Sequence, residues 1–113
     1  MTIPDLFTIQ HVQRSMRLIE LARAILAQLP TGYGFLADQL RRAASSVPLN
    51  FAEGCGKSTT RDRRRYFHTA RASAYEVAAI LDVGARFGVI TSTLHQEGKE
   101  ICDHVAAMLT NFR

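Results

Sequence analysis

Apolar side chains recur every three or four residues along nearly the whole chain, and polar side chains fill the positions between them. This spacing is typical of amphipathic helices that bury one face. It predicts four helices, over residues 9–29, 34–54, 59–86 and 91–112. The apolar positions that mark them are Val12, Met16, Ile19, Leu26 and Leu29, then Leu36, Leu40, Ala43, Val47 and Phe51, then Phe67, Ala70, Ala74, Val77 and Leu81, then Leu94, Ile101, Val105, Met108 and Phe112.

The breaks between these segments are short and contain residues that end or begin helices. They fall at 30–34, 54–59 and 87–91. In the middle break we expect Gly54 and Gly56 to take the left-handed conformation that ends a helix, and Ser58 or Thr59 to cap the next one. Short connections favour an antiparallel up-down-up-down four-helix bundle. The 113 residues are enough for one core, so residues 1–113 are predicted to form a single all-α domain.

The first helix carries a second apolar stripe, which consists of Leu18, Leu21 and Ile25. It is rotated away from the stripe assigned to the core. One interpretation is a wide surface that faces the core of the same chain. The other is a contact between subunits, because a soluble monomer rarely exposes such a patch. The three residues are therefore candidates for an oligomer contact.

Polar side chains also follow the second and third helices at helical spacing, just beside the apolar stripes. They are Arg42, Ser46, Asn50 and Glu53, then Arg65, Thr69, Ser73 and Glu76. Two antiparallel helices joined at residues 54–59 bring Ser46 opposite Thr69 and Arg42 opposite Ser73. We expect a continuous hydrogen-bonded seam that fixes the register of the two helices. A catalytic row is the weaker alternative, because the set contains no His or Cys.

Positive charge is concentrated in one part of the chain. The net charge is +4, and residues 41–71 hold eight basic side chains against Glu53 and Asp62. At about 100° per residue, one outward face of the third helix carries Arg61, Arg64, His68, Arg71 and Tyr75. Arg41, Lys57 and Arg63 are expected to widen this face at the corner between the second and third helices. Guanidinium groups bind phosphate through planar forks, so the pattern predicts a surface for RNA or DNA; a merely solvated face is the alternative.

Other kinds of chemistry are disfavoured by spacing. The GKST sequence at 56–59 has Phe51 where a nucleotide-binding loop needs its first glycine, and helical spacing precedes it. The four histidines lie on different helices without metal-binding spacing. We therefore expect no catalytic residue, metal or cofactor, and no enzyme. No apolar run approaches a membrane span, the N-terminus lacks a signal-peptide pattern, and the two cysteines are interpreted as reduced thiols, so the protein is expected to be cytoplasmic.

Three segments carry a resemblance to a known family: QLRRAASSVPLNFAEG at 39–54, GKS at 56–58 and ARASAYE at 70–76. The first contains the specific pattern R-A-x-x-S-[IV]-P-x-N-[IF]-A-E-G. The chain resembles, over nearly its whole length, the four-helix bundle proteins encoded in intervening sequences of large-subunit ribosomal RNA genes. One departure is Ala72, where the family more often has glycine.

This resemblance implies a small cytoplasmic bacterial bundle that assembles as a ring-like homopentamer, in a family whose members mostly have no established activity. One relative, the accessory variability determinant of diversity-generating retroelements, is a basic pentamer that binds nucleic acid and a reverse transcriptase. The expected partners are thus other copies of the chain, RNA or DNA, and a reverse transcriptase, with no membrane. Two functions follow: a non-enzymatic, oligomeric nucleic-acid-binding module, or a scaffold or adaptor that binds a protein.

Overall fold

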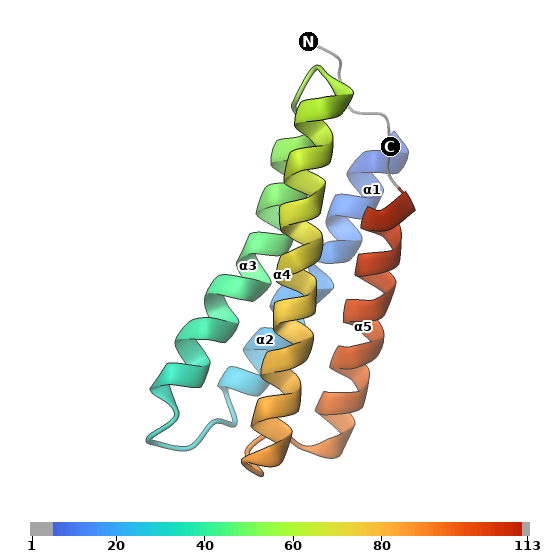
Figure 1. The fold of residues 1–113 in the computed structure, drawn as a ribbon. Helices are drawn as coiled ribbons and strands as arrows, with labels where there is room; N and C mark the ends of the chain where they lie inside the picture. The colour runs from blue at the N-terminus through green and yellow to red at the C-terminus, as the bar shows by residue number, and fades with distance from the viewer. Residues whose placement is uncertain (1–5, 112–113) are drawn as a thin grey trace.

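The computed structural model describes residues 6–111, with side chains from residue 10 onward. Its helices are α1 (Leu6–Ser15), α2 (Arg17–Leu26), α3 (Gly34–Cys55), α4 (Thr60–Arg86) and α5 (Ser92–Asn111). Only Met16 separates α1 from α2, so these two form one interrupted helix. Figure 1 shows this helix, α3, α4 and α5 side by side in an antiparallel arrangement, which confirms the predicted all-α, four-helix fold.

The interruption at Met16 has a local cause. The hydroxyl of Ser15, which is fully buried, donates to the carbonyl of Val12, and the backbone N–H of Met16 donates to Gln13 at 3.1 Å. Both bonds span three residues, whereas an α-helix uses four. Serine bonding back to a preceding carbonyl bends helices. The predicted first helix therefore exists, but in two pieces.

The corner between α3 and α4 is only partly as predicted. Thr59 is the N-cap of α4, as expected, and its side-chain oxygen accepts a hydrogen bond from the backbone N–H of Asp62 at 3.1 Å. Neither Gly54 nor Gly56 is left-handed; Gly32 and Gly88, in the other two connections, have positive φ angles. Gly54 lies inside α3, where an added Cβ would be 2.6 Å from Cε1 of Phe67. It is needed there for close packing, not for a turn.

The second apolar stripe of the first helix lies in the core, and most of the stripe assigned to the core from the sequence packs against it, namely Val12, Ile19, Leu26 and Leu29. Leu18, Leu21 and Ile25 are core residues, with exposed fractions of 0%, 6% and 1%. Met16, assigned to the core from the sequence, is 44% exposed. The reason is that α1 and α2 contact both α3 and α5, so their buried face is wide. Because these three side chains are already buried within one chain, they have almost no surface left for an oligomer contact, and that assignment is corrected.

Within residues 6–111, none of the helices has the length and apolar character required to cross a membrane.

Candidate nucleic-acid interface

The predicted basic face of α4 lies on the surface of the bundle. Arg61, Arg64 and His68 are exposed, Arg71 is half-buried, and Tyr75 is 54% exposed. The spacing of three and four residues keeps all five side chains on one side of α4. We call these five residues the α4 stripe.

No carboxylate neutralises the α4 stripe within the described side chains. The ion pairs found among residues 10–111 involve other groups: Arg41 with Asp38, Lys57 with Glu53, and both His95 and Lys99 with Asp82. An arginine without a carboxylate partner keeps its full charge available to an anion from solution. The stripe is therefore a positive surface in the described structure.

Arg71 differs from the other arginines of the stripe. Its guanidinium carbon lies 5.5 Å from the centre of the Tyr75 ring, within the range of a cation–π contact. Its Nε is buried and has no hydrogen-bond partner among the described residues. The Arg71 side chain is therefore held against Tyr75 by stacking, with one donor unused.

Two of the residues expected to widen the stripe have other contacts at the corner. The Nε of Arg63 donates to the carbonyl of Lys57 at 2.8 Å and so ties the first turn of α4 to the connection. The ammonium nitrogen of Lys57 lies 3.3 Å from a carboxylate oxygen of Glu53 and 5.1 Å from the centre of the Tyr66 ring. Both are basic and close to the stripe, but part of their bonding capacity is used within the chain.

Arg41 does not lie at the corner. It is fourteen residues before the end of α3, roughly 21 Å along the helix axis. It also pairs with Asp38 at 3.3 Å. The sequence interpretation placed Arg41 at the corner, and the length of α3 separates it from that end of the bundle.

The predicted polar seam forms only at its centre. Ser73 donates its hydroxyl to Ser46 at 2.7 Å, and the side-chain amide of Asn50 donates to both the hydroxyl and the carbonyl of Ser46 at 2.9 Å. Ser46 was predicted to face Thr69, so the true register is shifted by four residues, one helical turn. The shift arises because the first turn of α4 extends past the end of α3, where Arg63 bonds back to Lys57.

The outer members of the seam do not join it. Thr69 donates to the carbonyl of Arg65 in its own helix at 3.1 Å, and Glu53 pairs with Lys57. Arg42 and Glu76 are exposed, and no bond between them is present in the described structure. Arg65 lies 5.5 Å from the Tyr66 ring centre and is exposed. A continuous seam is therefore wrong; a three-residue cluster at Ser46 replaces it.

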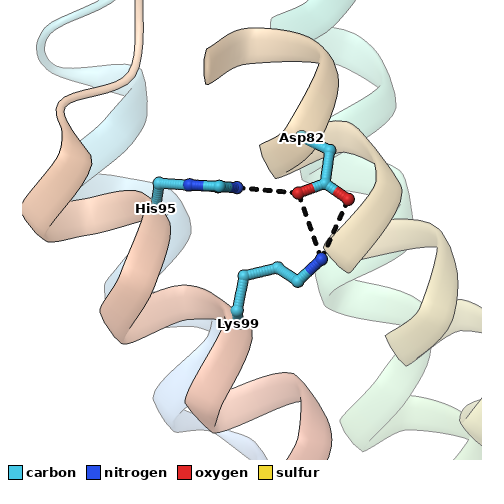
Figure 2. A network of polar contacts seen from close by, with 3 residues as sticks. All are labelled: Asp82, His95 and Lys99. Carbon is cyan, nitrogen blue, oxygen red and sulfur yellow. Dashed lines mark hydrogen bonds and ion pairs between the residues drawn. The ribbon is translucent and has the colours of Figure 1, made fainter. Parts of the chain in front are cut away.

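A polar network between α4 and α5 was not anticipated from the sequence. Figure 2 shows Asp82 of α4 between two side chains of α5: His95, 2.7 Å away through Nε2, and Lys99, whose ammonium donates to both carboxylate oxygens at 2.9 and 3.0 Å. These bonds, first to Lys99 and then to His95, lower the pKa of Asp82. The only sequence signal was the four-residue spacing of His95 and Lys99, which places both on one face of a helix.

A groove runs between the interrupted helix and α5. It has a volume of about 820 Å³ and is lined by side chains of mixed charge, namely Arg14, Arg17, Glu97, Glu100 and His104, with Ile101 and Val105. Within the described residues, no group of three His, Cys, Asp or Glu side chains is placed to hold a metal ion. Both cysteines are buried, and burial raises the pKa of the Cys102 thiol to about 12. A thiol with this pKa is not a nucleophile at neutral pH.

The fold and the exposed basic face define a class of protein: a small bundle of four antiparallel helices with a positively charged surface on its third helix. Residues 8–111 match the family model of the 23S rRNA-intervening sequence protein. The chain therefore belongs to this family, as its sequence segments at 39–54 and 70–76 predicted. No curated protein matches the chain. The family consists of small helical proteins that are not known as enzymes.

Proposed function

We propose that this protein is a non-enzymatic nucleic-acid-binding module that contacts the phosphate backbone of RNA or DNA through the α4 stripe. The observation that supports the proposal is the line of arginines Arg61, Arg64 and Arg71, which have no carboxylate partner among the described side chains. Guanidinium groups bind phosphate oxygens bidentately, and they do so best where no internal acid competes.

The dimensions of the α4 stripe fit a nucleic-acid strand. From Arg61 to Tyr75 the helix rises roughly 21 Å, which corresponds to about six stacked nucleotides at ~3.4 Å each. The stripe offers charges at regular intervals but no set of amide and carboxylate side chains that would read base edges. Binding is therefore mainly to the backbone and only weakly dependent on sequence. Assembly into a ring, which the family resemblance implies, would repeat the stripe and raise avidity.

Titration of labelled single- and double-stranded RNA and DNA at two salt concentrations tests this proposal. The variant Arg61→Glu/Arg64→Glu/Arg71→Glu is expected to bind at least about tenfold more weakly, with the slope of log affinity against log salt reduced by roughly 0.7–0.9 for each phosphate that the variant no longer neutralises. The matched control is Arg23→Glu/Arg42→Glu/Arg86→Glu, which reverses three exposed arginines elsewhere and changes the net charge equally.

The control variant is expected to keep a larger share of the affinity than the stripe variant. Equal binding by the wild type and the stripe variant, with the variant folded and in the same assembly, would contradict the proposal. Equal losses in both triple variants would also contradict it, because they would trace binding to net charge and not to the stripe.

A second candidate function, a scaffold or adaptor for a protein partner such as a reverse transcriptase, has one observation in its favour. Tyr33, Phe35 and Phe87 form an aromatic cluster at the end of the bundle opposite the α3–α4 corner, with ring centres 5.7 to 6.0 Å apart. Phe35 and Phe87 remain 51% and 55% exposed. Failure of every nucleic acid to bind in the titration above would favour this alternative.

A further inference from the structure

Tyr75 ends a line of arginines that have no carboxylate partner among the described side chains, and the guanidinium of Arg71 stacks on the Tyr75 ring. From this arrangement we infer that Tyr75 is a base-stacking site, and that the α4 stripe prefers single-stranded nucleic acid to duplex. The inference rests on the proposed function, since it specifies which form of nucleic acid the same surface takes. Arg61, Arg64 and Arg71 would follow the phosphates of one strand while an unpaired base lies on the tyrosine.

The exposure of Tyr75 distinguishes it from the other aromatic side chains near positive charge. Tyr66 is half-buried, and both Lys57 and Arg65 lie within 5.1 to 5.5 Å of its ring centre. Tyr75 has one cation over its ring among the described side chains, and the residue is 54% exposed. Unpaired bases stack on exposed aromatic rings of this kind, largely irrespective of their identity.

Arg71 is placed to serve the same strand. Its Nε has no hydrogen-bond partner among the described residues, so turning the guanidinium towards a phosphate breaks no bond of that atom and supplies the acceptor it lacks. Arg71 and Tyr75 are one helical turn apart, about 6 Å, so the phosphate and the base of neighbouring nucleotides are within their combined range.

A duplex cannot use the tyrosine in this way. Its bases are paired and already stacked on one another, so a rigid double helix presents only phosphates and sugars to the convex surface of α4. The arginines can bind the phosphates of both single strands and duplexes, whereas Tyr75 can stack only on an unpaired base. One base on an aromatic ring corresponds to roughly five- to hundredfold in affinity.

The test compares Tyr75→Leu and Tyr75→Phe with the wild type. The probes are an unpaired oligouridylate, the corresponding oligodeoxythymidylate, and RNA and DNA duplexes of the same length. Tyr75→Leu is expected to lower single-strand affinity by about five- to hundredfold and to leave duplex affinity within about twofold. Tyr75→Phe, which retains a ring, is expected to bind both forms like the wild type. Circular dichroism checks that each variant is folded.

Phe87→Leu is the matched control. Phe87 is as exposed as Tyr75 but lies about 18 Å further along α4, in the aromatic cluster. Phe87→Leu should leave the ratio of single-strand to duplex affinity unchanged. A probe strand with 2-aminopurine in place of one base supplies an independent signal, because stacking on Tyr75 quenches its fluorescence and Tyr75→Leu should abolish that quenching.

The inference would be overturned if Tyr75→Leu left the salt-dependent binding of both forms unchanged, or if it lowered single-strand and duplex affinity equally. Either result would leave the proposed function intact. A loss in Phe87→Leu that is as large and as selective for the single strand would overturn the inference as well. Absence of binding to every probe, even at low salt, would overturn the proposed function and this inference together.

Discussion

Asp82 shows how much a single residue can depend on a partner that is distant in sequence. Its carboxylate accepts hydrogen bonds from Lys99 and His95 across the α4–α5 contact (Figure 2), and these bonds hold the pKa of Asp82 below its usual value. The side chain is 38% exposed, so solvent screens the interaction. The network is therefore a modest clamp between two helices.

Replacement of Asp82 by Asn should lower the free energy of unfolding by up to about 1 kcal/mol at pH 7, because the charge-assisted bonds are removed. A carboxylate with a lowered folded pKa stabilises the protein above its unfolded pKa, near 4, and this contribution disappears as the pH falls through the folded pKa. The difference between wild type and Asp82→Asn should accordingly shrink below about pH 4.

Urea unfolding at pH 7 and at successively lower pH, at one protein concentration, measures this difference. Asp38→Asn is the control, since Asp38 pairs with Arg41 but its side chain is 82% exposed; it should stay within about 0.5 kcal/mol of wild type. A constant difference between wild type and Asp82→Asn over the whole range would mean that the carboxylate charge is not what stabilises the contact.

At the scale of helices, the α3–α4 corner depends on how closely the two backbones approach. Gly54 is buried, and an added Cβ there would lie 2.6 Å from Cε1 of Phe67 and 3.1 Å from Cβ of Tyr66. The Phe67 ring cannot move easily, because it is 5% exposed and packs against Phe51 with ring centres 5.4 Å apart. At Gly56, two residues later, an added Cβ would make only ordinary contacts, 3.5 Å from the carbonyl oxygen of Glu53 and 3.8 Å from that of Ala52, and the φ angle is −80°.

Alanine at these two glycines should therefore have opposite effects. Gly54→Ala is expected to destabilise the protein by about 1–3 kcal/mol through overpacking. The higher helix propensity of alanine offsets part of this cost. Gly56→Ala is expected to be neutral or to stabilise by up to about 1 kcal/mol, because it restricts the unfolded chain without strain. Urea denaturation of the two variants side by side measures both, and a stabilising Gly54→Ala would show that the corner is looser than described.

For the whole molecule, the question is which surface joins one chain to another. The family resemblance implies a homopentamer, but Leu18, Leu21 and Ile25 are buried within one chain and cannot supply its contact. Large apolar side chains that remain exposed are better placed, namely Met16, Phe35, Leu49, Val83 and Phe87. The bundle measures 46 × 22 × 18 Å, so these residues are spread over a long surface.

Light scattering on a size-exclusion column is expected to give the mass of a closed homopentamer. Leu18→Ala should leave that mass unchanged wherever the variant is folded, while it lowers the free energy of unfolding by about 2–5 kcal/mol as a core cavity does. A wild-type monomer at micromolar concentration would contradict the predicted assembly. A folded Leu18→Ala variant that dissociates without losing stability would restore the subunit-contact interpretation.

The sequence was sufficient for those features that depend on neighbours along the chain. Helical spacing located the four helices, and the spacing from Arg61 to Tyr75 placed those side chains on one outward face. The cap of α4 was narrowed to Ser58 or Thr59, and the structure shows that it is Thr59. The short segments at 39–54, 56–58 and 70–76 also indicated the family to which the chain belongs. Each of these follows from the 3.6-residue period of the helix or from short motifs, which are local properties.

Features that join separate helices were decided only by the tertiary structure. The four-residue error in the α3–α4 register and the burial of Leu18 both depend on how far one helix slides or rotates against another. Asp82 meets His95 and Lys99 for the same reason. Periodicity fixes the faces of each helix but not the axial offset between helices, because that offset is set by side-chain packing at contacts such as Gly54 with Phe67 and by the path of the connecting turn.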